Sequence, residues 1–163
     1  MLLLLLRHAD AGEHDPTRYP DDTLRELTPK GEKTQRAVSR WLRRHDLVPT
    51  LLLSSPWTRA WQTAAIVGET LELEPQACEA LAADPQIPAL RRAVGLGDAA
   101  RVVALVGHEP WLGRLGSLLL AGDAGRLTID FPKSGVLGLE TAELASARAS
   151  LRFFLRPKLV ESR

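Results

Sequence analysis

Two arginines and two histidines could together bind and transfer a phosphoryl group. Arg7 and His8 are adjacent, whereas Arg59 and His108 lie far along the chain. Arginine presents a planar fork of donors that can hold two phosphate oxygens, and it keeps its charge near neutral pH. A neutral imidazole is nucleophilic near pH 7 and can carry a phosphoryl group transiently. If folding brings these side chains together, they form a phosphoryl-transfer site that needs no separate base.

Each of these residues, taken singly, also has a purely structural explanation. The Arg7-His8 pair could lie on the surface or in the core, and His108 could cap the helix that follows it. Arg59, on a helical turn, could be a solvated side chain. The chemical interpretation is favoured because all three segments follow predicted buried strands.

Three apolar runs are predicted to be the strands that position these residues. They are Leu2–Leu6, Thr50–Leu53 and Arg101–Val106, and continuous apolar runs are typical of strands covered on both faces. Each is followed by a predicted helix. This alternation indicates an α/β fold, a three-layer αβα sandwich with a mostly parallel central sheet. Because the carboxyl ends of parallel strands meet at one edge, we expect the two arginines and two histidines to converge there.

Four helices are predicted from capping residues and apolar spacing. The first begins at Thr28-Pro29 and runs to about His45, because threonine is a good N-cap and proline is favoured at the first helical position. The second follows Ser54-Ser55-Pro56, again a hydroxyl cap before proline. The other two are Ile87–Val94 and the stretch from Pro110 to Gly122.

The remaining segments are less regular. A short strand is predicted near Gln76–Leu81, and the chain ends in three strand-like runs, Leu127–Phe131, Val136–Glu140 and Leu151–Arg156. We expect the last two runs to pair, although Thr141–Ala149 between them can also be interpreted as a helical turn. No repeat or linker divides the sequence, so we expect residues 1–163 to form a single domain.

The composition argues against several classes of partner. With 21 basic and 20 acidic side chains the formal net charge is +1, which gives no reason to expect a nucleic acid or an acidic membrane as partner. The N-terminal leucine run is too short for a signal peptide or a membrane helix. The single cysteine, Cys78, is expected to be an idle thiol in a reducing cytoplasm. No metal-binding motif is present, so we expect neither a metal nor a cofactor.

Three motifs resemble those of the histidine phosphatase superfamily, whose members are phosphoglycerate mutase-like. Leu6-Arg7-His8-Ala9 resembles the Arg-His-Gly signature, residues 54–64 (SSPWTRAWQTA) match the Ser-Pro-x-x-Arg-Ala-x-Gln-Thr-Ala block, and residues 106–110 (VGHEP) resemble the second histidine segment. The short length and residues 24–31 (LRELTPKG) are most similar to the SixA-type phosphohistidine phosphatases. The resemblance spans residues 5 to about 112 and implies a phosphoglycerate mutase-like fold.

The resemblance also implies roles for individual residues. It implies that the nucleophile is His8. It implies that the transferred phosphoryl group is bound by Arg7, Arg59 and His108, and that Arg25 lies at the mouth of the pocket. Ala9 replaces the glycine of the signature, which is tolerable if no positive φ is required there. Many members place an acidic proton donor in the middle region, where Glu79 and Asp84 are the available candidates.

The lack of an obvious proton donor bears on the substrate. An alkoxide is a poor leaving group and normally needs a proton, whereas the imidazole of a phosphohistidine leaves from an already weak P–N bond. A phosphohistidine-bearing protein is therefore the expected substrate, with a small phosphorylated metabolite as the alternative. A third interpretation is a non-catalytic, phosphate-binding regulatory domain, although a binding protein has no use for a nucleophile.

Overall fold

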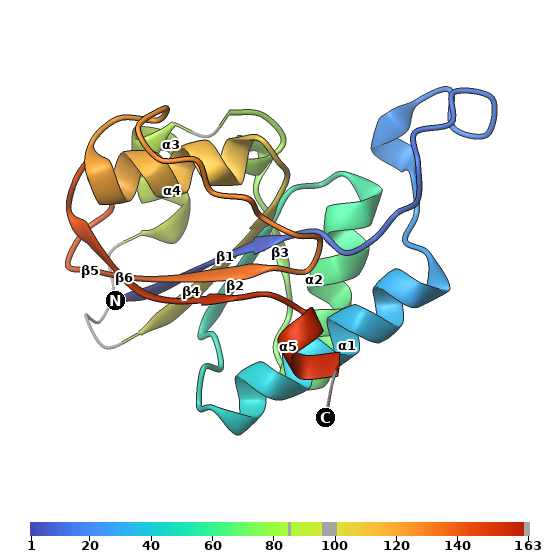
Figure 1. Cartoon of the computed structure of the whole chain (residues 1–163), viewed down its shortest axis with the longest axis horizontal. Helices are drawn as coiled ribbons and strands as arrows, with labels where there is room; N and C mark the ends of the chain where they lie inside the picture. Colours follow the sequence, from blue (N-terminus) through green and yellow to red (C-terminus); the bar gives the residue numbers. More distant parts are fainter. Residues whose placement is uncertain (85, 96–100, 162–163) are drawn as a thin grey trace.

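A six-stranded sheet in the order β3-β2-β4-β1-β5-β6 forms the centre of the molecule (Figure 1). The strands are β1 (Leu2–Arg7), β2 (Leu51–Ser54), β3 (Gln76–Ala77), β4 (Val102–Gly107), β5 (Val136–Thr141) and β6 (Ala149–Leu155). The first four run parallel to one another, and β5 is antiparallel to β1 and β6. The computed structural model describes residues 1–84, 86–95 and 101–161.

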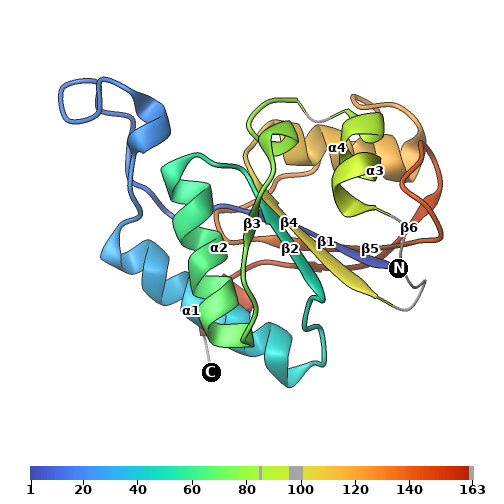
Figure 2. The same ribbon diagram turned by 180° about the vertical axis from the view of Figure 1, so that it is seen from behind.

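Helices cover both faces of this sheet (Figures 1 and 2). One layer holds α1 (Pro29–Arg44), α2 (Thr58–Leu71) and the short α5 (Lys158–Glu161), and the other holds α3 (Ile87–Val94) and α4 (Trp111–Ala121). Two 3₁₀ turns, η1 (Asp22–Leu24) and η2 (Glu79–Leu81), lie in the loops. The predicted three-layer α/β architecture is confirmed. None of the helices in the described ranges has the length and apolar character needed to span a lipid bilayer.

The leucine run of β1 is buried because the two helical layers cover alternate side chains. Leu3 and Leu5 belong to the cluster that includes the inner leucines of α3 and α4, whereas Leu4 and Leu6 pack in the cluster with α1 and α2. All four side chains are fully buried. Successive strand residues point to opposite faces, so a strand between two layers must be apolar at every position.

The prediction of a strand at Leu127–Phe131 is wrong. In this segment the amide of Leu127 donates to the Ser117 hydroxyl at 2.9 Å, and the amide of Phe131 donates to the nearby Ile129 carbonyl at 3.0 Å. Both sides of β1 are already paired, with β4 and with β5. Pro132 follows directly and has no N–H for a ladder. The segment is therefore a loop, and Phe131 is buried against the sheet.

The other uncertain segments are resolved in different ways. The predicted pairing of the last two strands is confirmed, because β5 and β6 form an antiparallel ladder. Thr141–Ala149 contains no helix: it consists of the ends of these strands and the turn that joins them. Within Gln76–Leu81 only the first two residues pair as a strand, and the η2 turn follows.

The carboxyl ends of β1, β2 and β4 meet at one edge of the sheet. Arg7 pairs with Gly107, and Ser54 pairs with Val106. The backbone pairing continues past the strands, since the amide of His8 donates to the Gly107 carbonyl at 3.0 Å and the amide of Ser55 donates to the Val106 carbonyl at 3.0 Å. The residues that follow the three strands are thus fixed side by side.

The start of α1 is joined to the loop that follows β1. The Thr28 hydroxyl caps the helix by accepting from the Gly31 amide at 3.0 Å, and the Thr28 amide donates to the Asp10 carbonyl at 2.9 Å. A Cβ atom at Gly31 would lie 2.2 Å from the Asp10 carbonyl oxygen. Glycine is therefore required where α1 crosses this loop, which explains the Thr-Pro-Lys-Gly sequence at positions 28–31.

Replacing Gly31 by alanine is expected to lower the free energy of unfolding by about 1–3 kcal/mol, the usual cost of forcing an extra carbon into a packed contact. The contact is with backbone, so no side-chain rotation can relieve it. Urea unfolding of the variant would measure the loss. Lys33→Ala, on the same helix and exposed, serves as the control and should change stability by less than about 0.5 kcal/mol. Equal stabilities for the two variants would contradict the prediction.

Candidate active site

His8 lies at the floor of the site, and one of its ring nitrogens is hydrogen-bonded to the backbone. Its imidazole is buried, and its Nδ1 is 2.7 Å from the carbonyl oxygen of Ala9. A carbonyl oxygen can only accept a hydrogen bond, so this contact requires the proton on Nδ1. The lone pair is then on Nε2, which is the atom available as a nucleophile.

The backbone around His8 is held by hydrogen bonds on two sides. The amide of Ala9 donates to the Thr63 hydroxyl at 3.0 Å, and that hydroxyl donates in turn to the Arg59 carbonyl at 2.6 Å. On the other side, the amide of Ser134 lies 3.2 Å from the carbonyls of both Arg7 and His8. Ala9 is not among the residues with a positive φ, so alanine fits where the superfamily signature has glycine.

His108 lies beside His8, as expected from the pairing of β1 and β4. Their ring centroids are 5.3 Å apart and the rings are tilted by 53°. His108 Nε2 is 2.8 Å from the Ser55 hydroxyl, and the ring packs against Trp57 at a centroid distance of 4.6 Å. His108 is buried. The second histidine is therefore fixed by residues that follow β2.

Arg59 enters the site from the first turn of α2. Its Nη1 donates to the backbone carbonyl of Asp22 at 2.7 Å, and its Nη2 is 3.2 Å from the Asp22 carboxylate. The guanidinium carbon lies 4.9 Å from the centroid of the Trp57 ring, a cation–π distance. The guanidinium is thus held between an aromatic side chain and the η1 turn.

Arg7 is the fourth residue of the site. Several buried nitrogen atoms of these four residues have no hydrogen-bond partner. Arg7 Nη1 donates to the Phe131 carbonyl at 2.5 Å, so the irregular segment before Pro132 orients it. Arg7 Nε, Arg59 Nε and His108 Nδ1 are buried without a hydrogen-bond partner, and in neutral His108 the Nδ1 atom is a donor when Nε2 accepts from the Ser55 hydroxyl. Buried polar atoms are normally paired. An oxyanion bound among these side chains would provide the missing acceptors.

The electrostatic environment keeps both histidines neutral. The pKa of His8 is lowered to about 3, mainly by burial; the hydrogen bond to Ala9 opposes the shift, and the neighbouring His108, Arg59 and Arg7 add to it. Burial also lowers the pKa of His108 to about 3, with Arg59 contributing next. The charges of Arg7 and Arg59 lower the pKa of both histidines, so the four predicted residues lie close enough to interact electrostatically. At neutral pH the His8 lone pair is unprotonated.

These shifts predict how stability depends on pH. A histidine that is neutral when folded but titrates near pH 6.5 when unfolded makes the unfolded state bind more protons below that pH. Stability should therefore fall as the pH drops from about 6.5 toward 3. Each buried histidine should cost roughly 1 kcal/mol between pH 7.5 and 5.5. His8→Asn should show a smaller decrease over this range in urea unfolding, and an unchanged decrease would contradict the assigned neutral state.

Comparisons with known proteins identify the family of this chain. Residues 3–82 match the family model of the histidine phosphatase superfamily (branch 1). An uncharacterized protein of Picosynechococcus sp. is 34% identical over 146 residues, 86% of each chain. The chain belongs to the histidine phosphatase superfamily. The sequence-based resemblance is confirmed at this level.

Solved structures of other phosphatases share the fold of this histidine phosphatase. The structure of the protein histidine phosphatase SixA complexed with tungstate matches with a TM-score of 0.80 and 22% identity, covering 98% of this chain and 99% of that one. The complex of mycobacterial glucosyl-3-phosphoglycerate phosphatase with inorganic phosphate matches with a TM-score of 0.68 and 19% identity, covering 93% and 95%. The predicted phosphoglycerate mutase-like fold of SixA type is confirmed.

Arg25 lies beside the site and reaches it through Asp22. Its Nη1 donates to the Gly12 carbonyl at 2.7 Å, and its Nε donates to Asp22 Oδ1 at 2.8 Å. Asp22 was not among the residues that the sequence indicated. Burial by itself would raise the pKa of Asp22, but hydrogen bonds from His14 and Arg25 and the charge of Arg59 lower it to about 2. Asp22 is therefore an ionised carboxylate next to Arg59.

The two acidic residues considered as proton donors, Glu79 and Asp84, form no hydrogen bond or ion pair with the site. Asp84 forms an ion pair with Arg114 at 3.0 Å. Glu79 is exposed in the η2 turn, and neither side chain is hydrogen bonded or ion-paired to the two histidines or the two arginines of the site. Glu109, which follows His108, accepts from the Gly113 amide at 3.3 Å and so caps α4.

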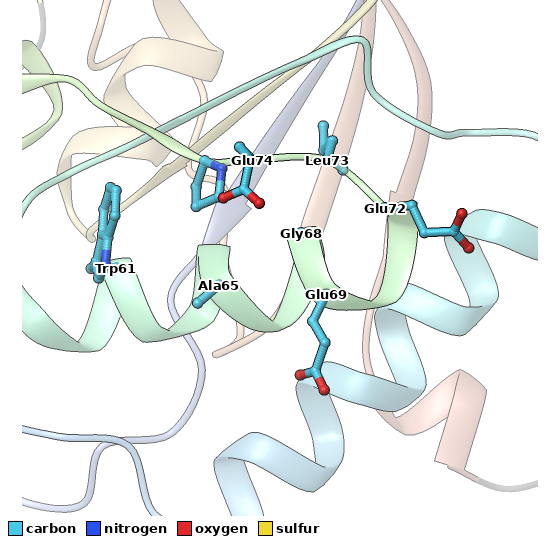
Figure 3. Close-up of a pocket in the computed structure, with 8 residues that line it drawn as sticks. Trp61, Ala65, Gly68, Glu69, Glu72, Leu73 and Glu74 are labelled. Carbon is cyan, nitrogen blue, oxygen red and sulfur yellow. The ribbon is translucent and has the colours of Figure 1, made fainter.

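A cavity of about 640 Å³ lies along α2, and its lining includes none of the two histidines and two arginines of the site (Figure 3). It is lined by Trp61, which is partly exposed, and by three glutamates, Glu69, Glu72 and Glu74. Glu69 and Glu72 pair with arginines of α1. No basic side chain lines this cavity, so it is unsuited to an anionic substrate. Within the described ranges, no group of three or more histidine, cysteine or acidic side chains has an arrangement that could hold a metal ion.

Proposed function

We propose that this histidine phosphatase hydrolyses a phosphorylated substrate through a phosphohistidine intermediate on His8. The observation that carries the proposal is the state of His8: a neutral imidazole with its lone pair on Nε2, beside His108 and two arginines that have unpaired donors. A domain that only binds phosphate has no need of a neutral, oriented nucleophile. We assign the whole activity to one domain formed by residues 1–163.

The proposed reaction consists of two in-line transfers. The lone pair of His8 Nε2 forms a bond to phosphorus while the bond to the leaving group breaks, and the leaving group keeps that electron pair. Water then attacks phosphorus, the P–N bond returns its electrons to Nε2, and both protons of the water stay with inorganic phosphate. Charge spreads over the equatorial oxygens in each transition state. Arg7, Arg59 and His108 would stabilise that charge as fixed donors.

We infer that the leaving group is an imidazole, so that the substrate is phosphohistidine, most simply on a protein. Asp22 is the carboxylate paired with Arg59, and it is ionised near neutral pH because its pKa is lowered to about 2. It is therefore a poor acid for protonating an alkoxide. An imidazole departs as a neutral molecule when its far nitrogen carries a proton, and that proton exchanges with water near neutral pH.

The test of this function compares substrates side by side. The purified protein should release phosphate from a phosphohistidine-bearing protein with a higher kcat/KM than from a panel of small phosphomonoesters, including a sugar phosphate and p-nitrophenyl phosphate. Rapid hydrolysis of the phosphomonoesters, with the phosphohistidine protein left intact, would overturn the substrate assignment. The covalent intermediate would stand in that case, because both reactions use the same nucleophile.

A small-molecule phosphomonoesterase is the second candidate. It is favoured by the fold shared with the mycobacterial glucosyl-3-phosphoglycerate phosphatase. An enzyme of this kind needs a proton donor for an alkoxide leaving group. Glu79 and Asp84 form no hydrogen bond or ion pair with the site residues, whereas Glu109, which follows His108 and lies within electrostatic reach of Arg7, has a pKa raised by burial. The same substrate panel separates the two functions, and detection of a phosphoenzyme would exclude a purely regulatory, phosphate-binding domain.

A further inference from the structure

The imidazole of His14 lies close to Arg59, on the other side of the Asp22 carboxylate. Nδ1 of His14 lies 2.9 Å from Asp22 Oδ1, while the other carboxylate oxygen, Oδ2, is 3.2 Å from Arg59 Nη2. One carboxylate therefore joins an imidazole ring to the guanidinium that is placed to bind the phosphoryl group. Since a carboxylate only accepts, His14 must donate from Nδ1.

These side chains form a series that becomes more exposed from the floor of the site outward. His8 is 6% exposed, the side chain of Arg59 is also 6% exposed, and those of Asp22 and His14 are 33% and 60% exposed. In an in-line transfer the leaving group lies opposite the nucleophile. With His8 at the floor, the leaving group must face the solvent, which is where Asp22 and His14 lie.

Figure 1 shows why this rim comes from a separate part of the chain. The loop between β1 and α1, drawn in blue, stands out from the carboxyl edge of the sheet and carries η1. Asp22 is anchored within it by Arg25, whose Nε donates to Oδ1 at 2.8 Å, and its backbone carbonyl accepts from Arg59. The carboxylate is therefore held in position, whereas His14 is an exposed side chain.

We propose that the Asp22 carboxylate is the subsite for the imidazole of a phosphohistidine substrate, and that His14 occupies this subsite in the free protein. The inference rests on the proposed function. The substrate imidazole carries phosphorus on one nitrogen and, in its protonated form, a hydrogen on the other. Asp22 accepts that N–H, so that cleavage of the P–N bond releases a neutral imidazole, which keeps both the bond electrons and the proton on its far nitrogen.

The substrate must displace His14, which gives the first test. His14→Ala should lower the KM for N-phosphorylimidazole by about two- to fivefold, because the removed competitor is a half-exposed pair of modest strength. The KM for p-nitrophenyl phosphate, which has no ring N–H, should not change. His45→Ala removes another exposed histidine, at the end of α1, and should leave both KM values unchanged. A wild-type KM for N-phosphorylimidazole in the His14→Ala variant would overturn the proposal.

Asp22→Asn tests the acceptor itself. The kcat/KM for N-phosphorylimidazole should fall at least about tenfold more than that for p-nitrophenyl phosphate, the scale of a lost hydrogen bond to a charged group. An equal loss for the two substrates would mean that Asp22 only positions Arg59, and would overturn the subsite. If this variant does not fold, as judged by circular dichroism, the His14→Ala result decides alone. Wild-type protein that hydrolyses p-nitrophenyl phosphate but not N-phosphorylimidazole would instead refute the assignment of phosphohistidine as the substrate.

Discussion

His8→Ala is expected to abolish turnover and to prevent any phosphoryl labelling of the protein. His8 Nε2 carries the lone pair that forms the P–N bond in the proposed reaction, and no other side chain of the site offers a neutral nitrogen in an equivalent position. His108 is neutral too, but its Nε2 is engaged with the Ser55 hydroxyl. Removing a nucleophile typically costs on the order of 10⁶ in kcat. The loss should be similar for every substrate, because all of them would use this intermediate.

Two measurements check this expectation. Wild-type protein mixed with a phosphorylated substrate and quenched during turnover should carry an acid-labile, base-stable phosphoryl group, as a phosphoramidate does. The His8→Ala variant should carry none. His45→Ala controls for loss of an exposed histidine and should be labelled as wild type. Retained turnover in His8→Ala, or labelling of that variant, would rule out His8 as the nucleophile.

Arg59→Ala is expected to lower kcat by about 10²–10³, equivalent to about 2.7–4 kcal/mol, the usual effect of removing one preorganised donor from a site of developing charge. The guanidinium is fixed by Trp57 and by the Asp22 carbonyl before any substrate arrives. It therefore needs little reorganisation during the reaction. Phosphate should also become a weaker product inhibitor, because the same donors bind the ground-state anion.

A matched pair of variants isolates the role of the guanidinium. Arg59→Lys keeps the charge but loses the planar fork, so it should restore only part of the activity lost in Arg59→Ala. Arg40→Ala, an exposed change on α1, should behave as wild type. Both measurements require only kcat and KM with one substrate. Wild-type kcat in Arg59→Ala would show that Arg59 takes no part in the transition state.

Much of the fold could be predicted because its strands and helices carry strong local signals. The leucine run of β1 is apolar at every position since two layers cover it, and Thr28-Pro29 marks the start of α1 through its cap. The site could be predicted for a related reason. The residues that follow parallel strands lie at one edge of the sheet. The prediction that His8 and His108 lie side by side therefore required only that β1 and β4 be neighbours.

The failures arose where long-range contacts override local pattern. Leu127–Phe131 has the composition of a strand, but β1 is paired on both sides and offers no edge to it. The segment instead provides the Phe131 carbonyl that orients Arg7. Nothing in the sequence around Phe131 indicates that contact, because it joins residues 124 positions apart.

Asp22 was missed for a similar reason. It lies in a polar loop rich in aspartate and proline, where a carboxylate is normally solvated, and its contact with Arg59 joins residues 37 positions apart. The middle-region acids Glu79 and Asp84 were considered because of where the family places a donor, but neither forms a hydrogen bond or ion pair with the histidines, since Asp84 pairs with Arg114 and Glu79 is exposed. A single sequence cannot show which loop carboxylate folds back onto an arginine.

The placement of His8 at the end of a strand buried on both faces has a thermal consequence. β1 is enclosed by both core clusters, so the floor of the site can be disrupted only by global unfolding, whereas the rim around His14 and Asp22 belongs to an exposed loop that can open locally at much lower cost. On warming, amide protons of Leu3–Leu6 should therefore be among the last to exchange. Discrimination between substrates should decline at temperatures where the nucleophile is still in place, and catalysis should cease only when the sheet melts.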